Sequence, residues 1–201
     1  MTTQYLSAAE TAKLIRTSLK EAFPGVKFGV RSNTYSGGAS VDVRWVDGPN
    51  EAQVEAVANT FKGSYFDSGI DYKGSILHLM GGQPTRFGAD YIFFRREHSD
   101  AAVAHAIERF ARMFAGNLCR DQIEKPTVAQ WRCGALLQLQ LSGVHYSFSR
   151  SVHSEISDIL AKSSDRLRVA KSKTAASVFV MGDDGSVSYT HLRAHETRHD
   201  L

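Results

Sequence analysis

The chain has 201 residues, 42% of them hydrophobic, so it can bury the core of one domain, or of one domain and an appendage. Its 24 basic and 21 acidic residues leave a net charge of +3, a mild excess that identifies no partner by itself. The two cysteines are too few for a disulfide framework, and no apolar run reaches the length of a signal peptide or the roughly 18 residues of a membrane span. We therefore expect a soluble protein of a reducing, cytoplasmic compartment with no membrane contact.

The N-terminal part predicts a helix followed by a β-hairpin. Residues 7–10 form a capping-box pattern, and apolar residues then recur at helical spacing until Pro24. Apolar and polar residues alternate over residues 26–31 and again over 41–46, as they do in half-buried strands. Residues 35–38 supply the turn between the two strands.

The next stretch predicts a second helix and two more strands. Asn50 can cap the helix, with Gln53 at the reciprocal capping-box position. Residues 70–77 predict one strand, and residues 81–84 predict a turn. Residues 91–94 are consecutive apolar residues, which predict a strand buried on both faces.

Ser99 can cap a third helix, whose apolar stripe extends to Phe114. The predicted order is therefore α-β-β-α-β-β-α. This order indicates the α+β class, with one antiparallel sheet and helices packed on one of its faces. We place this domain at residues 1–117.

Residues 118–186 predict a second α+β segment, which we expect to be incomplete. Its predicted elements are one or two strands near residues 137–141, a helix over residues 151–167 and a hairpin over residues 177–189.

Residues 187–201 resemble the translation of a sequencing adapter rather than a natural C-terminus. The codons of a transposase-type adapter encode residues 187–197 one by one, so we expect the natural gene to have been cut near Ser186. This tail contains three histidines at four-residue spacing, a pattern typical of zinc ligands on a helix, namely His191, His195 and His199. We reject a zinc site there because the histidines belong to the adapter-like tail.

Several ordered blocks between residues 5 and 115 resemble one protein family. The blocks are residues 5–16, 23–28, 35–38, 45–49, 51–55 and 87–91. The family is the large polyvalent protein-associated domain of type 29, found in multi-domain proteins of phages and conjugative plasmids. The resemblance implies an accessory role beside mobile DNA, and it carries over no catalytic residue.

The residues themselves suggest one functional surface, a basic and aromatic face on the predicted hairpin and the last predicted strand. Its residues are Lys27, Arg31, Tyr35, Arg44, Arg95 and Arg96. Such a face can follow a phosphate backbone while an aromatic ring stacks on a base. The simpler alternative is the solvated face of a half-covered sheet.

We expect a non-enzymatic accessory or interaction module that uses no cofactor and no metal, and whose partner is nucleic acid or another protein domain. Asp67, Asp71 and Asp90 lack the spacing of a metal site, and the glycines of residues 35–40 lack the ending of a phosphate-binding loop. Two alternatives stay open. One is a nucleic-acid-binding domain that uses the basic hairpin face, and the other is the front end of an enzyme whose active site follows Ser186.

Overall fold

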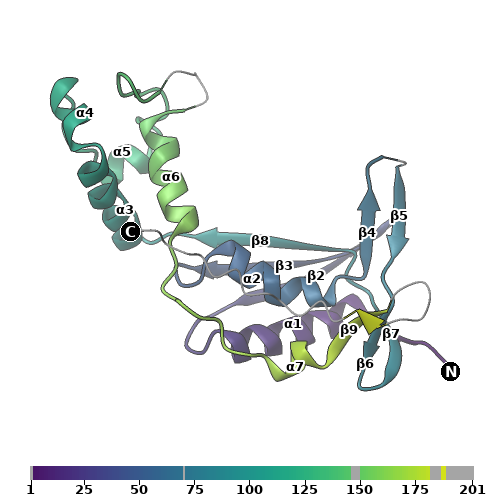
Figure 1. Cartoon of the computed structure of the whole chain (residues 1–201). Coiled ribbons are helices and arrows are strands. Elements are labelled where there is room, and N and C mark those ends of the chain that lie inside the picture. The colour runs from purple at the N-terminus through teal and green to yellow at the C-terminus, as the bar shows by residue number, and fades with distance from the viewer. Residues whose placement is uncertain (1, 70, 146–149, 182–186, 189–201) are drawn as a thin grey trace. The chain divides into compact units, whose positions relative to one another are not determined.

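The fold is known from a computed structural model, which describes residues 2–69, 71–145, 150–181 and 187–188 (Figure 1). The chain divides into two compact units. The first unit is Met1–Arg96 together with Arg166–Leu201, and the second is Glu97–Asp165. The α+β class is confirmed, but the described strands form three sheets instead of one.

The first predicted helix and the first hairpin are confirmed. Helix α1 (Ala8–Ala22) begins with a capping box, in which the Ser7 backbone N–H donates to Glu10 Oε2 at 2.8 Å. Strands β2 (Gly29–Tyr35) and β3 (Gly38–Val46) pair antiparallel around a two-residue turn.

The second predicted helix, α2 (Glu51–Ala58), has the expected Asn50 and Gln53 capping box. A 3-10 turn (Asn59–Phe61) follows it directly.

Strand β8 (Tyr91–Glu97) completes a three-stranded sheet in the order β2-β3-β8. The Asp90 N–H donates to the Ala39 carbonyl at 2.9 Å, and Arg96 Nη2 donates to the Gly48 carbonyl at 2.9 Å. The later residue of β8 thus contacts the later residue of the β3 segment, so β8 runs in the same direction as β3. The expectation of a purely antiparallel sheet is therefore wrong.

Helices α1 and α2 share one core with this sheet, and Figure 1 shows both helices on the same side of it. The core residues alternate along β3 and recur at helical spacing along α1, as the sequence predicts. They include Ile15, Leu19, Val30, Val41, Val43, Trp45, Val54 and Val57.

The prediction that residues 91–94 are buried on both faces is wrong. Ile92 and Phe94 pack against the core, whereas Phe93 is 54% exposed. The reason is geometric, because successive side chains of a strand point to opposite faces and the two helices cover only one face of this sheet.

A second sheet, in the order β1-β7-β6-β9-β10, combines segments from both ends of the chain. Its strands are β1 (Gln4–Leu6), β7 (Gln83–Phe87), β6 (His78–Met80), β9 (Val178–Met181) and β10 (Val187–Ser188). β1, which the sequence did not predict, runs parallel to β7, whereas β6 pairs antiparallel with β7 and with β9, and β9 pairs antiparallel with β10. The predicted turn at residues 81–84 is shorter than expected, since Gly81 and Gly82 alone connect β6 to β7, both with positive φ.

The third sheet is the two-stranded hairpin of β4 (Ser64–Asp67) and β5 (Tyr72–Ser75). The strand predicted over residues 70–77 is therefore divided between β5 and β6, and residue 70 lies outside the described residues. Tyr65 lies opposite Gly74, and its ring fills the space that a Cβ at Gly74 would occupy. Figure 1 shows this hairpin standing away from the other strands of the first unit.

The segment after residue 165 returns to the first unit. Helix α7 (Lys173–Ala176) packs on α1, and β9 pairs with β6. Ala175 and Val178 are buried in the first core. The chain therefore passes from one unit to the other after Arg96 and after Asp165. Residue 117, where the sequence places the end of the first domain, lies in helix α4 (Ala115–Arg120).

Strands β9 and β10 form the hairpin predicted over residues 177–189, with Val187 opposite Met181. Its predicted turn at residues 182–185 lies outside the described residues, as do the three histidines of the adapter-like tail.

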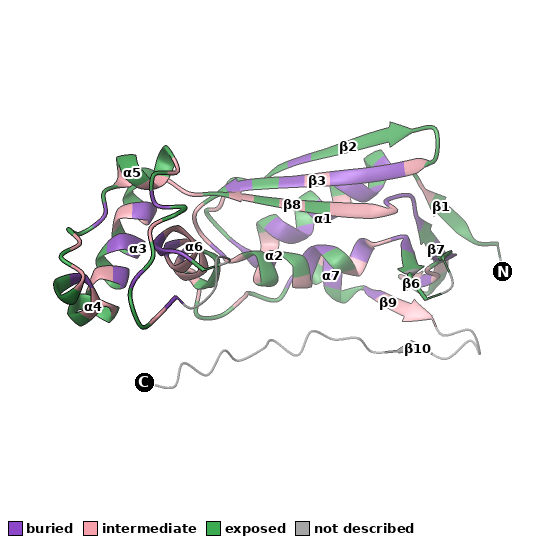
Figure 2. Ribbon diagram, turned by 90° about the horizontal axis from the view of Figure 1, so that it is seen from above, coloured by how far each residue is buried: buried purple, intermediate pink, exposed green. Residues whose placement is uncertain are grey.

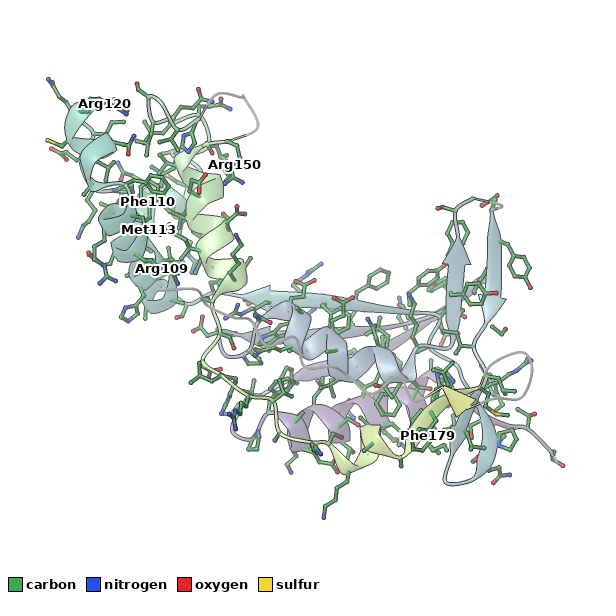
Figure 3. The ribbon with its side chains drawn as sticks, in the orientation of Figure 1. Arg109, Phe110, Met113, Arg120, Arg150 and Phe179 are labelled. Atoms are coloured by element: carbon green, nitrogen blue, oxygen red, sulfur yellow. The ribbon has the colours of Figure 1, made fainter. Side chains whose placement is uncertain are left out.

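The second unit is helical over its described residues. Its helices are α3 (Asp100–Met113), α4 (Ala115–Arg120), α5 (Val128–Arg132) and α6 (Val152–Lys162). Figure 3 shows Phe110 on the side of α3 that faces α6, and this side chain is fully buried. Ser99 caps α3, as the sequence predicts. Ser151 caps α6, where the helix predicted over residues 151–167 begins, but α6 ends earlier, at Lys162.

The strands predicted near residues 137–141 are wrong. Backbone N–H groups there donate three residues back, from Leu137 to the Gly134 carbonyl and from Leu139 to the Leu136 carbonyl, so the chain forms turns. The alternation of Leu137, Leu139 and Leu141 imitates a strand in the sequence, but the buried residues are Leu136 and Leu141, and Leu137 is exposed. No helix of the described residues is both long enough and apolar enough to cross a bilayer.

Candidate nucleic-acid interface

The face of the β2-β3-β8 sheet opposite α1 and α2 is the candidate site, and we call it the platform. Its residues follow from strand alternation and from the β2 to β3 register, which sets Arg31 across from Asp42. They include Arg31, Asn33 and Tyr35 on β2, Asp42 and Arg44 on β3, and Tyr91, Phe93, Arg95 and Glu97 on β8. Figure 2 shows β2 exposed along most of its length.

Aromatic rings are exposed on the platform. Tyr91 and Phe93 are two residues apart on β8, and their rings are nearly parallel, with an interplanar angle of 12° and centroids 6.2 Å apart. Phe93 is 54% exposed and Tyr35 is 46% exposed. An exposed ring on an open sheet provides a surface on which planar groups can stack.

Three arginines of the platform carry its positive charge. Arg31, Arg44 and Arg95 are exposed, and none forms an ion pair with any residue that the structure describes. Asp42, half-buried opposite Arg31, and Glu97, exposed at the end of β8, offset part of this charge. The guanidinium groups therefore remain available for an anion, since their donors are not used by a carboxylate.

The β4–β5 hairpin adds a cation and a ring at the edge of the platform. Lys73 Nζ lies 2.9 Å from Asp90 Oδ2 and 5.7 Å from the centroid of the Tyr91 ring. Phe66 lies opposite Lys73 in the hairpin and is 54% exposed. Asp90 Oδ2 also accepts the Ala39 N–H at 3.1 Å, so one carboxylate connects the hairpin to the sheet. Its hydrogen bond to Lys73 raises the pKa of that ammonium, which keeps the group charged.

The structure brings together four of the six residues that the sequence singled out. Arg31, Tyr35, Arg44 and Arg95 lie on the platform. Lys27 precedes β2 and lies outside the sheet.

Arg96 points to the opposite side of the sheet from Arg95, because the two residues are consecutive in one strand. Its guanidinium donates to the carbonyls of Asp47 and Gly48 at 3.2 and 2.9 Å. Arg96 therefore anchors the loop after β3 and is not part of the platform.

Sequence reasoning missed the two aromatic residues of β8. Tyr91, Phe93 and Arg95 alternate with Ile92 and Phe94, and this period of two is the signal of one exposed face. The contribution of Lys73 and Phe66 had no such signal, since it depends on how the β4–β5 hairpin docks against Asp90.

The platform lies entirely within a stretch that matches a known family. Residues 6–99 match the family model of the Large polyvalent protein associated domain 29. No curated protein and no solved structure matches the chain.

Proposed function

We propose that this chain is an accessory module of a mobile-element protein, of phage or plasmid origin, because residues 6–99 form a domain of the large polyvalent protein associated domain 29 family. In this proposal the module acts without catalysis in the cytoplasm, and its platform binds single-stranded nucleic acid. The observation that carries the proposal is the nearly parallel pair of rings of half-buried Tyr91 and exposed Phe93, beside three arginines without ion-pair partners among the described residues.

Single strands suit this surface better than duplexes. A base in a single strand presents its face to an aromatic ring, and each such stack contributes about 1–3 kcal/mol. A duplex keeps the faces of its bases inside the helix, so the rings of Phe93 and Tyr35 would gain little from it. The phosphates of the strand would meet Arg31, Arg44 and Arg95.

Because the platform has only a few cations, the proposal also predicts a modest dependence of affinity on salt concentration. Three arginine contacts correspond to a slope of about −2 in a plot of log affinity against log salt concentration for a single strand. Replacing Arg31 and Arg44 with glutamine should reduce the size of this slope by about 1.4.

The first test is fluorescence anisotropy with a labelled deoxythymidine oligonucleotide of about ten nucleotides. Phe93→Ala should weaken binding by about 5- to 150-fold, because it removes one stacking ring. Tyr72→Ala is the matched control. Tyr72 is 53% exposed, but it lies on the face of the β4–β5 hairpin opposite Lys73, so its loss should leave binding unchanged.

Two results would contradict the proposal. One is the absence of binding to single-stranded DNA and RNA at low salt. The other is equal loss of affinity in Phe93→Ala and Tyr72→Ala, since that would mean that the platform has no special part in binding.

A further inference from the structure

A pocket of about 480 Å³ lies in the first unit, beside the turn of the β2–β3 hairpin. Segments distant in sequence line it, and its lining residues include Tyr5, Tyr35, Gly63, Arg86, Gly88 and Asp90. Its volume is within the range of small-molecule sites in proteins, about 300–1,000 Å³. Tyr35 belongs to both the pocket and the platform, so the two surfaces are continuous.

Close backbone contacts hold the pocket wall in place. The Gly63 N–H donates to the Ala89 carbonyl at 2.8 Å, and the Gly88 N–H donates to the Leu6 carbonyl at 2.7 Å. A Cβ at Gly63 would lie 1.9 Å from the Phe87 carbonyl oxygen, and one at Gly88 would lie 2.8 Å from the Leu6 carbonyl oxygen. Only glycine permits these approaches, so the wall forms with the fold and needs no ligand to shape it.

The unmatched charge at the pocket is positive. Arg86 is exposed and forms no ion pair with any described residue. The carboxylate of Asp90 is already used, because it pairs with Lys73 and accepts the Ala39 N–H. An anionic group, and a phosphate in particular, therefore suits the guanidinium of Arg86.

Aromatic rings stand beside this cation. Tyr5 is the register partner of Arg86 in the parallel pair of β1 and β7, and it is 68% exposed. Tyr35 is 46% exposed and lines the same pocket. A ligand that carries both a planar ring and a phosphate matches these two features together.

We propose that this pocket binds one nucleotide, with its base against a tyrosine ring and its phosphate at Arg86. The inference rests on the proposed function in one respect, since Tyr35 would link a strand on the platform to the pocket. The nucleotide could be free or could be the phosphorylated end of that strand, and the experiment separates these sources.

The first arm uses isothermal titration calorimetry on the full chain with thymidine 5′-monophosphate and with thymidine. The monophosphate should bind more tightly than thymidine. Arg86→Gln should weaken its binding by about 10- to 150-fold, the value of a hydrogen-bonded charged group. Arg109→Gln, an exposed arginine on α3 in the other unit, is the matched control and should bind like the parent chain (Figure 3).

The second arm compares oligonucleotides that carry a 5′-phosphate, a 3′-phosphate or no terminal phosphate. If the pocket holds a strand end, one terminal phosphate should tighten binding to the parent chain and have no effect on Arg86→Gln. If the pocket holds a free nucleotide, the monophosphate should bind and the terminal phosphates should have no effect. Ser36→Glu adds a carboxylate at the pocket rim in an exposed turn, and it should reproduce the loss seen with Arg86→Gln.

The pocket and the platform fail in different ways. Oligonucleotide binding that depends on Phe93, with no binding of the monophosphate and no effect of any terminal phosphate, would overturn the pocket and leave the platform. Monophosphate binding that depends on Arg86, with no effect of Phe93→Ala on oligonucleotides, would support the pocket and overturn the platform. Equal weakening by Arg86→Gln and Arg109→Gln would also overturn the pocket.

Discussion

At the scale of single residues, Glu21 connects the two ends of the first unit. Its carboxylate accepts hydrogen bonds from Ser172 Oγ at 2.7 Å and from the Thr174 N–H and Oγ1, both at 3.0 Å. The backbone N–H of Thr174, followed by the Ser172 hydroxyl, lowers the pKa of the Glu21 carboxyl below its ordinary 4.5. One ionised side chain on α1 thus holds the start of α7.

The lowered pKa of Glu21 predicts a stability contribution that depends on pH. A carboxyl with a depressed folded-state pKa stabilises the fold above its unfolded pKa, and this contribution is lost as the pH falls through the folded value. Glu21→Gln should therefore lower the free energy of unfolding by about 1.5 kcal/mol at neutral pH, and the difference should shrink below about pH 4.5. Urea unfolding in a Trp131→Phe background, followed by the fluorescence of Trp45, measures both quantities.

Glu51→Gln is the control for this prediction, because Glu51 is an exposed carboxylate in the first turn of α2. It should change the free energy of unfolding by only about 0.5 kcal/mol at neutral pH. A difference between the parent chain and Glu21→Gln that stays constant from neutral to acidic pH would show that the ionised carboxylate is not what holds α7.

At the scale of elements, the turn of the β2–β3 hairpin depends on the close approach of Gly38 to Asp90. A Cβ at Gly38 would lie 2.3 Å from Asp90 Oδ2, the atom that accepts the Ala39 N–H and pairs with Lys73. Gly38→Ala should displace this carboxylate and lower the free energy of unfolding by about 1–3 kcal/mol. Because the same carboxylate docks the β4–β5 hairpin, the variant should also increase amide exchange at Lys73 and its neighbours.

The neighbouring Gly37 provides a matched comparison. A Cβ there meets nothing within 4 Å, and its φ is not in the region that favours glycine. Gly37→Ala should therefore change stability by less than about 0.5 kcal/mol. Equal destabilisation by the two substitutions would mean that general stiffening of the turn, and not the contact with Asp90, is the cause.

The elements that could be predicted from the sequence are those fixed by residues close together in the chain. Ser7 with Glu10 and Asn50 with Gln53 cap helices across three residues, and the pattern alone identifies them. The pairing of β1 with β7 joins Leu6 to Phe87, and neither strand carries a signal for the other. The direction of β8 is equally hidden, since it depends on the crossover that packs α2 against the sheet.

Part of the candidate site could also be predicted from the sequence. Arg31, Tyr35 and Arg44 follow from the alternation of a hairpin whose turn is local. Arg95 and Arg96 are consecutive, so strand geometry alone permits only one of them on the platform. The exposure of Phe93 could not be inferred with the same certainty, because a short apolar run is compatible with one covered face or with two.

At the scale of the whole molecule, each unit has its own hydrophobic core and its own tryptophan. Trp45 is buried in the first core and donates its indole N–H to the Pro49 carbonyl at 3.0 Å. Trp131 packs beside the second core and stacks on His153, with centroids 5.1 Å apart. Variants that keep one tryptophan therefore report on one unit at a time.

These two reporters test whether the segment after residue 165 completes the first core. Val178 on β9 is 5% exposed and packs with residues of α1 and the β2-β3-β8 sheet, although more than 80 residues separate it from β8. Val178→Ala should lower the stability reported by Trp45, in a Trp131→Phe background, by about 1.5 kcal/mol. It should leave unchanged the stability reported by Trp131 in a Trp45→Phe background.

Val152→Ala, in the core of the second unit, is the control and should give the reverse pattern. If Val178→Ala lowers both signals equally, the two cores unfold as one cooperative structure, and if it lowers neither, β9 contributes nothing to the first core.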